Sequence, residues 1–361
     1  MKLVSICFAA AAIAGCATRD SDHGSRNPPH PPAAEKHRAP APKETRVFDI
    51  KSSDDLLALD SQYSALWESG FEGTVEVNIG PGPLAPSGWS LHPGTAKGEP
   101  RIDLVLRGSG GVFPLPGRIR ARSVRIENVI LTGTRSAPAE IRVSTEFAMK
   151  RVMLVDGRFA DPNFEGGWIE VFADGGKRSA ARAAIEDSWF VRNYQLKAPM
   201  RLVSFLSRGE DGGAFERVRV AHSAFLGNAF AVDLGVDFAT SVGIEDSFFY
   251  RNWPTGSELR CASCGAVTVE RSAFAVERLD EVASVEATPP VLVRGSRILL
   301  RDGKASAKSP ALSVAAAQIE ERGASADAAV AEIITGLTAQ PLKMPSSDVW
   351  ERLEAVFRAP R

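Results

Sequence analysis

Three charged residues, Glu170, Arg201 and Asp233, are the strongest candidates for chemistry in this sequence. Inverting glycoside hydrolysis uses two carboxyl groups about 6.5–9.5 Å apart. A polysaccharide lyase instead uses carboxylates that bind calcium and an arginine or lysine that acts as the base. This set could serve either reaction if the fold brings the three side chains to one surface. The simpler interpretation is an ordinary charged face of a sheet.

A repeat in the sequence determines how these residues are spaced. The phrases IEDSWFVRN (185–193) and IEDSFFYRN (244–252) are nearly identical, and fainter copies lie before, between and after them. Aligned on their first residue, the copies are separated by 23, 36, 35, 24, 25 and 24 residues, so the basic period is about 24. We call the aligned residues the anchors: Ile126, Met149, Ile185, Val220, Ile244, Val269 and Val293.

Other positions of the repeat share one character in each copy. Five residues after the anchor stand Leu131, Leu154, Phe190, Phe225, Phe249, Phe274 and Ile298. Two residues after it stand the mostly polar Asn128, Arg151, Asp187, His222, Asp246, Arg271 and Gly295. The apolar positions alternate with a period of two, which is typical of strands and not of helical repeats. We therefore predict stacked parallel strands with buried apolar columns, a tight turn that carries a polar ladder, and a short structural ladder of Asn193, Asn228 and Asn252.

The repeat resembles the right-handed parallel β-helix, or pectin-lyase-like, superfamily over roughly residues 72–316. The resemblance implies an all-β solenoid of roughly nine to ten coils, but it fixes no activity. An amphipathic helix is predicted at 53–67 as an N-terminal cap, and C-terminal helices are predicted to cover the other end. The last of them is expected to bury one face. That face would be made by Val349, Trp350, Leu353, Val356 and Phe357.

The extra residues of the longer copies predict loops at 161–167, 174–182 and 207–216 that wall a groove over one sheet. In the superfamily, acidic polysaccharide lies in such a groove. The polar side chains expected on this sheet are Arg142, Glu170, Arg201, Asp233, Arg260 and Glu286, and the tryptophans that could stack on sugar rings are Trp168, Trp189 and Trp253. The catalytic signatures of the superfamily are missing from this sequence, which puts catalysis in doubt.

The first residues have the pattern of an export signal. Lys2 precedes an apolar stretch at 3–14, and Ile13-Ala14-Gly15-Cys16 resembles the lipobox of bacterial lipoproteins. The resemblance implies cleavage after residue 15 and lipidation of Cys16, palmitate included. Ala17 then favours the outer membrane over the inner one. An ordinary secretory signal is the alternative.

The predicted order along the chain is a signal peptide (1–15), a lipidated cysteine with a proline-rich tether (16–46), a β-helix with its cap helix (47–316) and a helical C-terminal cap (317–361). Cys261 and Cys264 are predicted to form a local disulfide, with redox chemistry or zinc binding as alternatives. The net charge of −1 gives no case for nucleic acid. No metal or cofactor is predicted, and calcium would be implied only for a lyase.

The leading hypothesis is a lipid-anchored envelope protein that binds polysaccharide or an envelope partner without catalysis. The first alternative is a polysaccharide lyase or glycoside hydrolase that uses Glu170, Arg201 and Asp233, with Trp168, Arg142, Arg260 and Trp253 as binding residues. The second is a scaffold that binds protein. The fold alone does not decide between these functions.

Overall fold

The computed structural model describes residues 44–80, 89–93, 98–135, 137–159, 166–174, 180–195, 201–207, 213–250, 256–286, 289–301 and 312–357. The chain divides into two units, Met1–Pro42 and Lys43–Arg361, and all the described residues belong to the second. The predicted signal peptide, Cys16 and most of the tether therefore lie outside the described residues.

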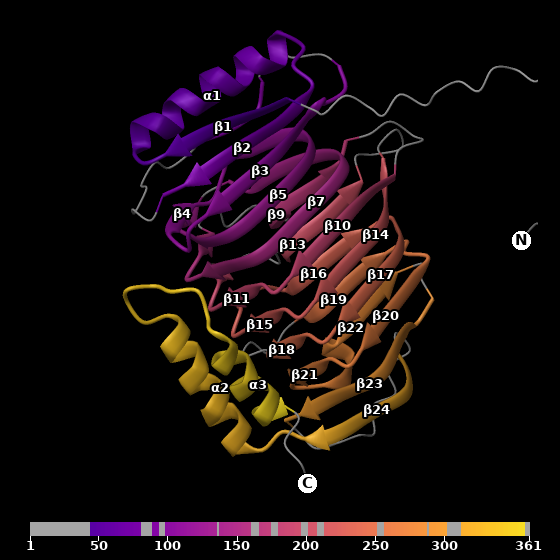
Figure 1. The fold of residues 1–361 in the computed structure, drawn as a ribbon. Helices are drawn as coiled ribbons and strands as arrows, with labels where there is room; N and C mark the ends of the chain where they lie inside the picture. The colour runs from indigo at the N-terminus through magenta and orange to yellow at the C-terminus, as the bar shows by residue number, and fades with distance from the viewer. Residues whose placement is uncertain are drawn as a thin grey trace, which may run out of the picture. The chain divides into compact units, whose positions relative to one another are not determined.

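The second unit consists mainly of parallel strands that stack in three columns and form a solenoid-like sheet around an apolar core (Figure 1). Column A contains β1 (Glu44–Ile50), β2 (Gly73–Ile79), β3 (Ile102–Gly108), β10 (Ala180–Glu186), β14 (Ala214–Ala221), β17 (Ala239–Glu245) and β20 (Ala266–Glu270). Column B contains β4 (Val112–Pro114), β11 (Trp189–Val191), β15 (Ala224–Leu226), β18 (Phe248–Tyr250) and β21 (Ala273–Val276). Column C contains β9 (Gly167–Ala173), β13 (Arg201–Ser207), β16 (Val232–Asp237), β19 (Ser257–Ala262) and β22 (Ala283–Glu286).

Four longer strands pass through more than one column. These are β5 (Arg118–Thr132), β7 (Ala139–Val155), β23 (Val291–Leu300) and β24 (Leu312–Glu321). A small separate sheet joins β6 (Thr134–Arg135), β8 (Arg158–Phe159) and β12 (Tyr194–Gln195). The helices are α1 (Ser53–Glu68), the 3-10 turn η1 (Leu279–Glu281), α2 (Ala324–Leu337) and α3 (Ser347–Phe357). No helix in the described part of the chain is long and apolar enough to cross a membrane.

The strand register confirms the alignment of the repeat. Each anchor pairs with the anchor of the next copy, from Ile126 opposite Met149 to Val269 opposite Val293. The column five residues later also pairs in register throughout. Within it, Phe190, Phe225, Phe249 and Phe274 stack face to face, with ring centroids 4.5, 4.7 and 4.8 Å apart. Residues at the same position of the repeat therefore occupy equivalent positions in the core.

The predicted tight turn is a corner between columns A and B, made by one residue in the left-handed region. All seven predicted turn residues have φ between 45° and 54°. A serine follows five of them. In the first four, the serine backbone N–H donates to the hydroxyl oxygen of the next coil's serine, as between Ser188 and Ser223 at 3.2 Å. The hydroxyl of each serine donates to the carbonyl two residues earlier. Side-chain contacts also join neighbouring corners, as predicted: Asp187 with His222 at 2.8 Å and Asp246 with Arg271 at 2.8 Å.

A buried asparagine pair supports the next bend. The Asn193 amide donates to the Leu154 carbonyl and to Asn228 Oδ1, both at 3.0 Å. Its own Oδ1 accepts from the Gly157 N–H at 3.0 Å. This confirms the predicted structural ladder for two of its members. The third, Asn252, lies outside the described residues.

Helix α1 buries Leu56, Leu59 and Tyr63 against the core next to β1, with a capping box at Ser52. The C-terminal helices differ from the expectation that they cover the end of the solenoid. They lie beside column B, where Trp350, Leu353 and other apolar residues of α2 and α3 pack on its outward face (Figure 1). The strands of column B are therefore buried on both sides, which explains their unbroken apolar triplets.

Two predicted boundaries also move. Strand β1 begins at Glu44, so the last residues assigned to the tether already belong to the sheet. Strand β24 continues to Glu321, inside the segment predicted as helical cap. The described part of column A consequently has eleven strands, against the nine to ten coils predicted. Both additional strands lie at the ends, where the repeat is faintest.

Replacing Asn193 with alanine should destabilise the protein. The Gly157 N–H and the Leu154 carbonyl would lose a buried partner, so the free energy of unfolding should fall by about 1–3 kcal/mol. Urea denaturation of Asn193→Ala measures the change. Asn78→Ala is the matched control because its amide bonds Asp49 at an exposed site, and it should alter stability by no more than about 0.5 kcal/mol. Equal losses in both variants would contradict a structural role for the pair.

Candidate functional site

The outward surface of column C, which we call the column C face, carries most of the predicted site residues. Because the strands pair in register, its side chains form rows across the coils. One row contains Arg118, Glu140, Glu170, Ser204, Gly235, Arg260 and Ser284. The parallel row begins with Arg120, Arg142, Phe172 and Leu206. Neighbours in a row are about 4.8 Å apart along the solenoid.

Glu170 lies near the middle of the first row and is almost completely buried. The Gly167 N–H donates to its Oε1 at 2.9 Å, which restrains the carboxyl group. Burial raises the pKa of Glu170, and the adjacent Glu140 raises it further, against the opposing effects of the Gly167 N–H and of Arg201. Glu170 is therefore a carboxyl group whose environment favours its protonated form.

Arg201 comes to the same surface, but its ionic partner is not one that the sequence predicted. Its side chain extends over Gly235, where an added Cβ would lie 2.4 Å from Arg201 Cδ. Its Nη1 then pairs with Asp237 at 2.9 Å. The Arg201 side chain can pass here only because Gly235 has no Cβ atom, and the ion pair with Asp237 fixes the position of its guanidinium group. Both residues alternate with the core residues of β16, and that alternation was the signal that could have found them.

The predicted set of Glu170, Arg201 and Asp233 lies on neighbouring strands but does not form one row. The register partners of Glu170 are Glu140 and Ser204, whereas Asp233 lies next to Val232, which pairs with Arg201. Asp233 is buried and lies two residues before Gly235, so it shares the phase of Gly235 and Asp237 along β16. The ionic partner that the structure shows for Arg201 is Asp237. A catalytic role for the predicted set stays a prediction.

The predicted binding residues divide in the same way. Arg142 is on the column C face and forms an ion pair with Glu140, and Arg260 is in the first row. Trp168 is fully buried: an added Cβ on Gly157 would collide with its ring, and it stacks on Phe230 at 6.1 Å. Trp189 packs against Trp350 of α3 at 5.7 Å. Neither indole presents a face to a sugar, because each fills an apolar contact.

Other predicted features of the groove lie outside the described residues. These are Trp253 and most of the three loops, namely residues 161–165, 175–179 and 208–212. Where the structure describes the flanks of the face, Asp174 accepts from Arg120 Nε at 2.9 Å. His92 is also close to this end of the face, where burial and then Arg142 and Arg120 lower its pKa. Sequence analysis missed both Arg120 and His92, because they precede the copies with the clearest repeat.

Cys261 and Cys264 are adjacent buried thiols, with Ser263 between them in the left-handed region at φ 56°. The hydrogen bond to Cys264 and burial raise the pKa of the Cys261 thiol. Both cysteines are free thiols in this structure. The disulfide between them stays a prediction. Among the described residues, no group of three or more His, Cys, Asp or Glu side chains is arranged to hold a metal ion.

Comparison with known protein families, with curated proteins and with solved structures found no match to this chain.

Replacing Glu170 with glutamine should stabilise the protein at neutral pH. A carboxyl group whose folded pKa is raised contributes stability below its unfolded pKa and loses that contribution as pH rises through its folded pKa. The gain of Glu170→Gln over the native chain should therefore grow from pH 4 to pH 7 in thermal melts. Glu216→Gln is the control, because Arg182 lowers the pKa of Glu216 and its substitution should give no such gain. A gain of Glu170→Gln that is independent of pH would contradict the raised pKa.

Proposed function

We propose that this chain is a cell-envelope lipoprotein whose strands form a right-handed parallel β-helix, and that its column C face binds an extended polysaccharide without cleaving it. The handedness follows the rule for connections between parallel strands of one sheet. The three columns and the period of about 24 residues support this fold. Export and lipidation rest on the lipobox-like sequence that ends at Cys16.

The burial of three arginines on the column C face is the observation that carries this function, although Arg118 at the start of its first row is 66% exposed. Arg120, Arg142 and Arg201 have side chains that are 18%, 19% and 15% exposed. On column A, the outward Arg107 and Arg125 are 49% and 50% exposed. Charges that are partly removed from water interact more strongly with a ligand. The column C face is therefore better prepared for polar recognition than the other charged face.

The arrangement of these groups suits a long hydroxylated polymer. Guanidinium and carboxylate groups lie side by side on two neighbouring coils, as with Arg118, Glu140 and Arg142. Each guanidinium has five donors, so an ion pair leaves others for hydroxyl or carboxylate groups of a glycan. Because cations and carboxylates are interleaved, the face favours a polymer with both donors and acceptors over a densely anionic one.

One observation favours hydrolysis as a second candidate. Glu140 and Glu170 are direct register partners on neighbouring strands, so their backbones are about 4.8 Å apart. Retaining glycosidases place their two carboxyl groups about 5–5.5 Å apart, with one of them protonated. The raised pKa of Glu170 fits the acid in such a pair, and Glu140 forms ion pairs with Arg118 and Arg142. This candidate replaces the predicted set that contained Asp233.

Arg142→Ala should weaken polysaccharide binding about 10-fold or more, because a charge-assisted hydrogen bond contributes about 1.5–3 kcal/mol. Affinity electrophoresis of the purified full chain against neutral and uronate-containing glycans measures retention. Arg271→Ala is the matched control, since it removes the same charge at a corner between columns A and B. Equal weakening by both variants, or no retained glycan, would sink the proposal. New reducing ends that disappear in Glu170→Gln would establish the second candidate instead.

Cys16→Ala should abolish incorporation of labelled palmitate and move the protein from the membrane fraction to the soluble one. Acyl chains on Cys16 are the expected anchor, and more than one chain is needed for stable attachment. Cys264→Ala keeps Cys16 and should still be labelled. Labelling that persists in Cys16→Ala would show that the lipid is carried elsewhere.

A further inference from the structure

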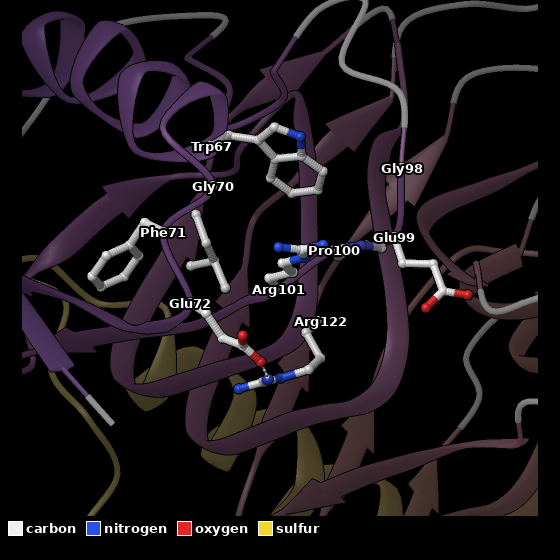
Figure 2. Close-up of a pocket in the computed structure, with 10 residues that line it drawn as sticks. Trp67, Gly70, Phe71, Glu72, Gly98, Glu99, Pro100, Arg101 and Arg122 are labelled. Atoms are coloured by element: carbon white, nitrogen blue, oxygen red, sulfur yellow. Dashed lines mark ion pairs between the residues drawn. The ribbon is translucent and has the colours of Figure 1, made fainter. Parts of the chain in front are cut away.

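A cavity of about 600 Å³ lies beside the C-terminal end of α1 (Figure 2). Its lining residues are Trp67, Gly70, Phe71, Glu72, Gly98, Glu99, Pro100, Arg101, Ile102 and Arg122. Gly70 and Gly98 have φ of 73° and 113°, and no atom lies within 4 Å of where their Cβ atoms would be. The left-handed turns thus shape two open sides of the cavity.

Trp67 supplies the apolar wall and is held in place. The Arg120 guanidinium lies over its ring, with Cζ 5.4 Å from the ring centroid. Arg120 is itself fixed, because Nη2 donates to the Gly98 carbonyl at 3.1 Å and Nε pairs with Asp174 at 2.9 Å. In Figure 2 the indole of Trp67 lies above the side chain of Arg101. The wall is therefore formed before any ligand binds.

Two arginines, Arg101 and Arg122, line this space. Arg122 is oriented by Asp103, which accepts from its Nε at 2.7 Å and also from its Nη2. Its Nη1 faces Glu72 at 3.7 Å, a distance beyond that of a normal hydrogen bond. Arg101 has no hydrogen-bond or ionic partner among the described residues. Donors from two arginines thus remain available to a ligand.

The charges of the residues that line the cavity limit the class of ligand that it can bind. Arg101 and Arg122 are balanced by Glu72 and Glu99, so a ligand with one negative charge is tolerated better than a dianion. A planar carboxylate matches the fork of a guanidinium. The carboxylates of Glu72 and Glu99 accept hydrogen bonds from hydroxyl groups, and the face of an indole suits the C–H face of a ring. The volume is within the range of pockets that bind small molecules.

We propose that this cavity binds one sugar ring that carries a single carboxylate group. Arg101 and Arg122 hold the carboxylate, Trp67 covers the ring, and Glu72 and Glu99 accept its hydroxyl groups. The site borders the column C face through Arg120, which contacts Trp67 and Gly98, but it does not depend on the function proposed for that face. It would recognise a free sugar acid or the end of a glycan chain, since both present the same group.

Isothermal titration of the purified full chain with glucuronate, glucose and glucose 6-phosphate tests the proposal. Glucuronate should bind, glucose should bind about 10-fold more weakly or not at all, and the phosphate dianion should bind no better than glucose. Arg101→Ala should weaken glucuronate binding about 10-fold. Arg125→Ala, which removes an exposed arginine on the same strand as Arg122, should leave it unchanged. Circular dichroism confirms that both variants are folded.

The proposal is overturned if glucose binds as tightly as glucuronate, if glucose 6-phosphate binds more tightly, or if Arg101→Ala binds as the native chain does. Absence of glucuronate binding also overturns it. Arg142→Ala separates the two sites, because it should keep glucuronate binding while it weakens polysaccharide binding. Loss of polysaccharide binding with intact glucuronate binding therefore concerns only the column C face.

Discussion

Every coil from β5 onward depends on a corner made by one left-handed residue. For a non-glycine residue this conformation costs about 1–2 kcal/mol, and all but one of the seven corners from Asn128 to Gly295 use such a residue. The corner also turns the backbone N–H of the next residue away from the hydrogen bonds between strands. The serine hydroxyl of the next coil accepts from that N–H, as Ser223 does from Ser188. Five successive corners are followed by a serine, and these serines supply the acceptors for the N–H groups that the corners turn away.

The corner fixes the register of everything that follows it. A shift of one residue would exchange inward and outward side chains along a whole strand. With the register set, Phe190 and Phe225 stack, and Asn193 meets Asn228 at the next bend. The same order places Glu140 beside Glu170 on column C, where their proximity and burial raise the pKa of Glu170. The charge environment of the column C face thus depends on the backbone geometry of the corner between columns A and B.

The sequence predicted most of the fold because the fold repeats. Anchors, corners and the aromatic column all came from aligned positions, and the structure places them as aligned. Column C was harder, since loops of different length separate it from the repeat. Asp237, the ionic partner of Arg201, was therefore not among the predicted residues. Likewise, one apolar face on α3 predicts that it is covered but does not say by which surface. The apolar triplets Trp189–Val191 and Phe248–Tyr250 are the sequence signal for that surface. Three successive apolar residues indicate a strand that is buried on both faces.

Helices α2 and α3 cover the outward face of column B. The charged outward faces are therefore those of columns A and C. The outward ion pairs of column A, such as Arg107 with Glu76, are largely hydrated and contribute little to stability. Those of column C involve side chains that have already lost much of their water, which costs free energy in the absence of a ligand. Part of the desolvation that a polar ligand would require is therefore complete before binding. Within the described residues, no helix packs on the outward side of column C as α2 and α3 do on column B.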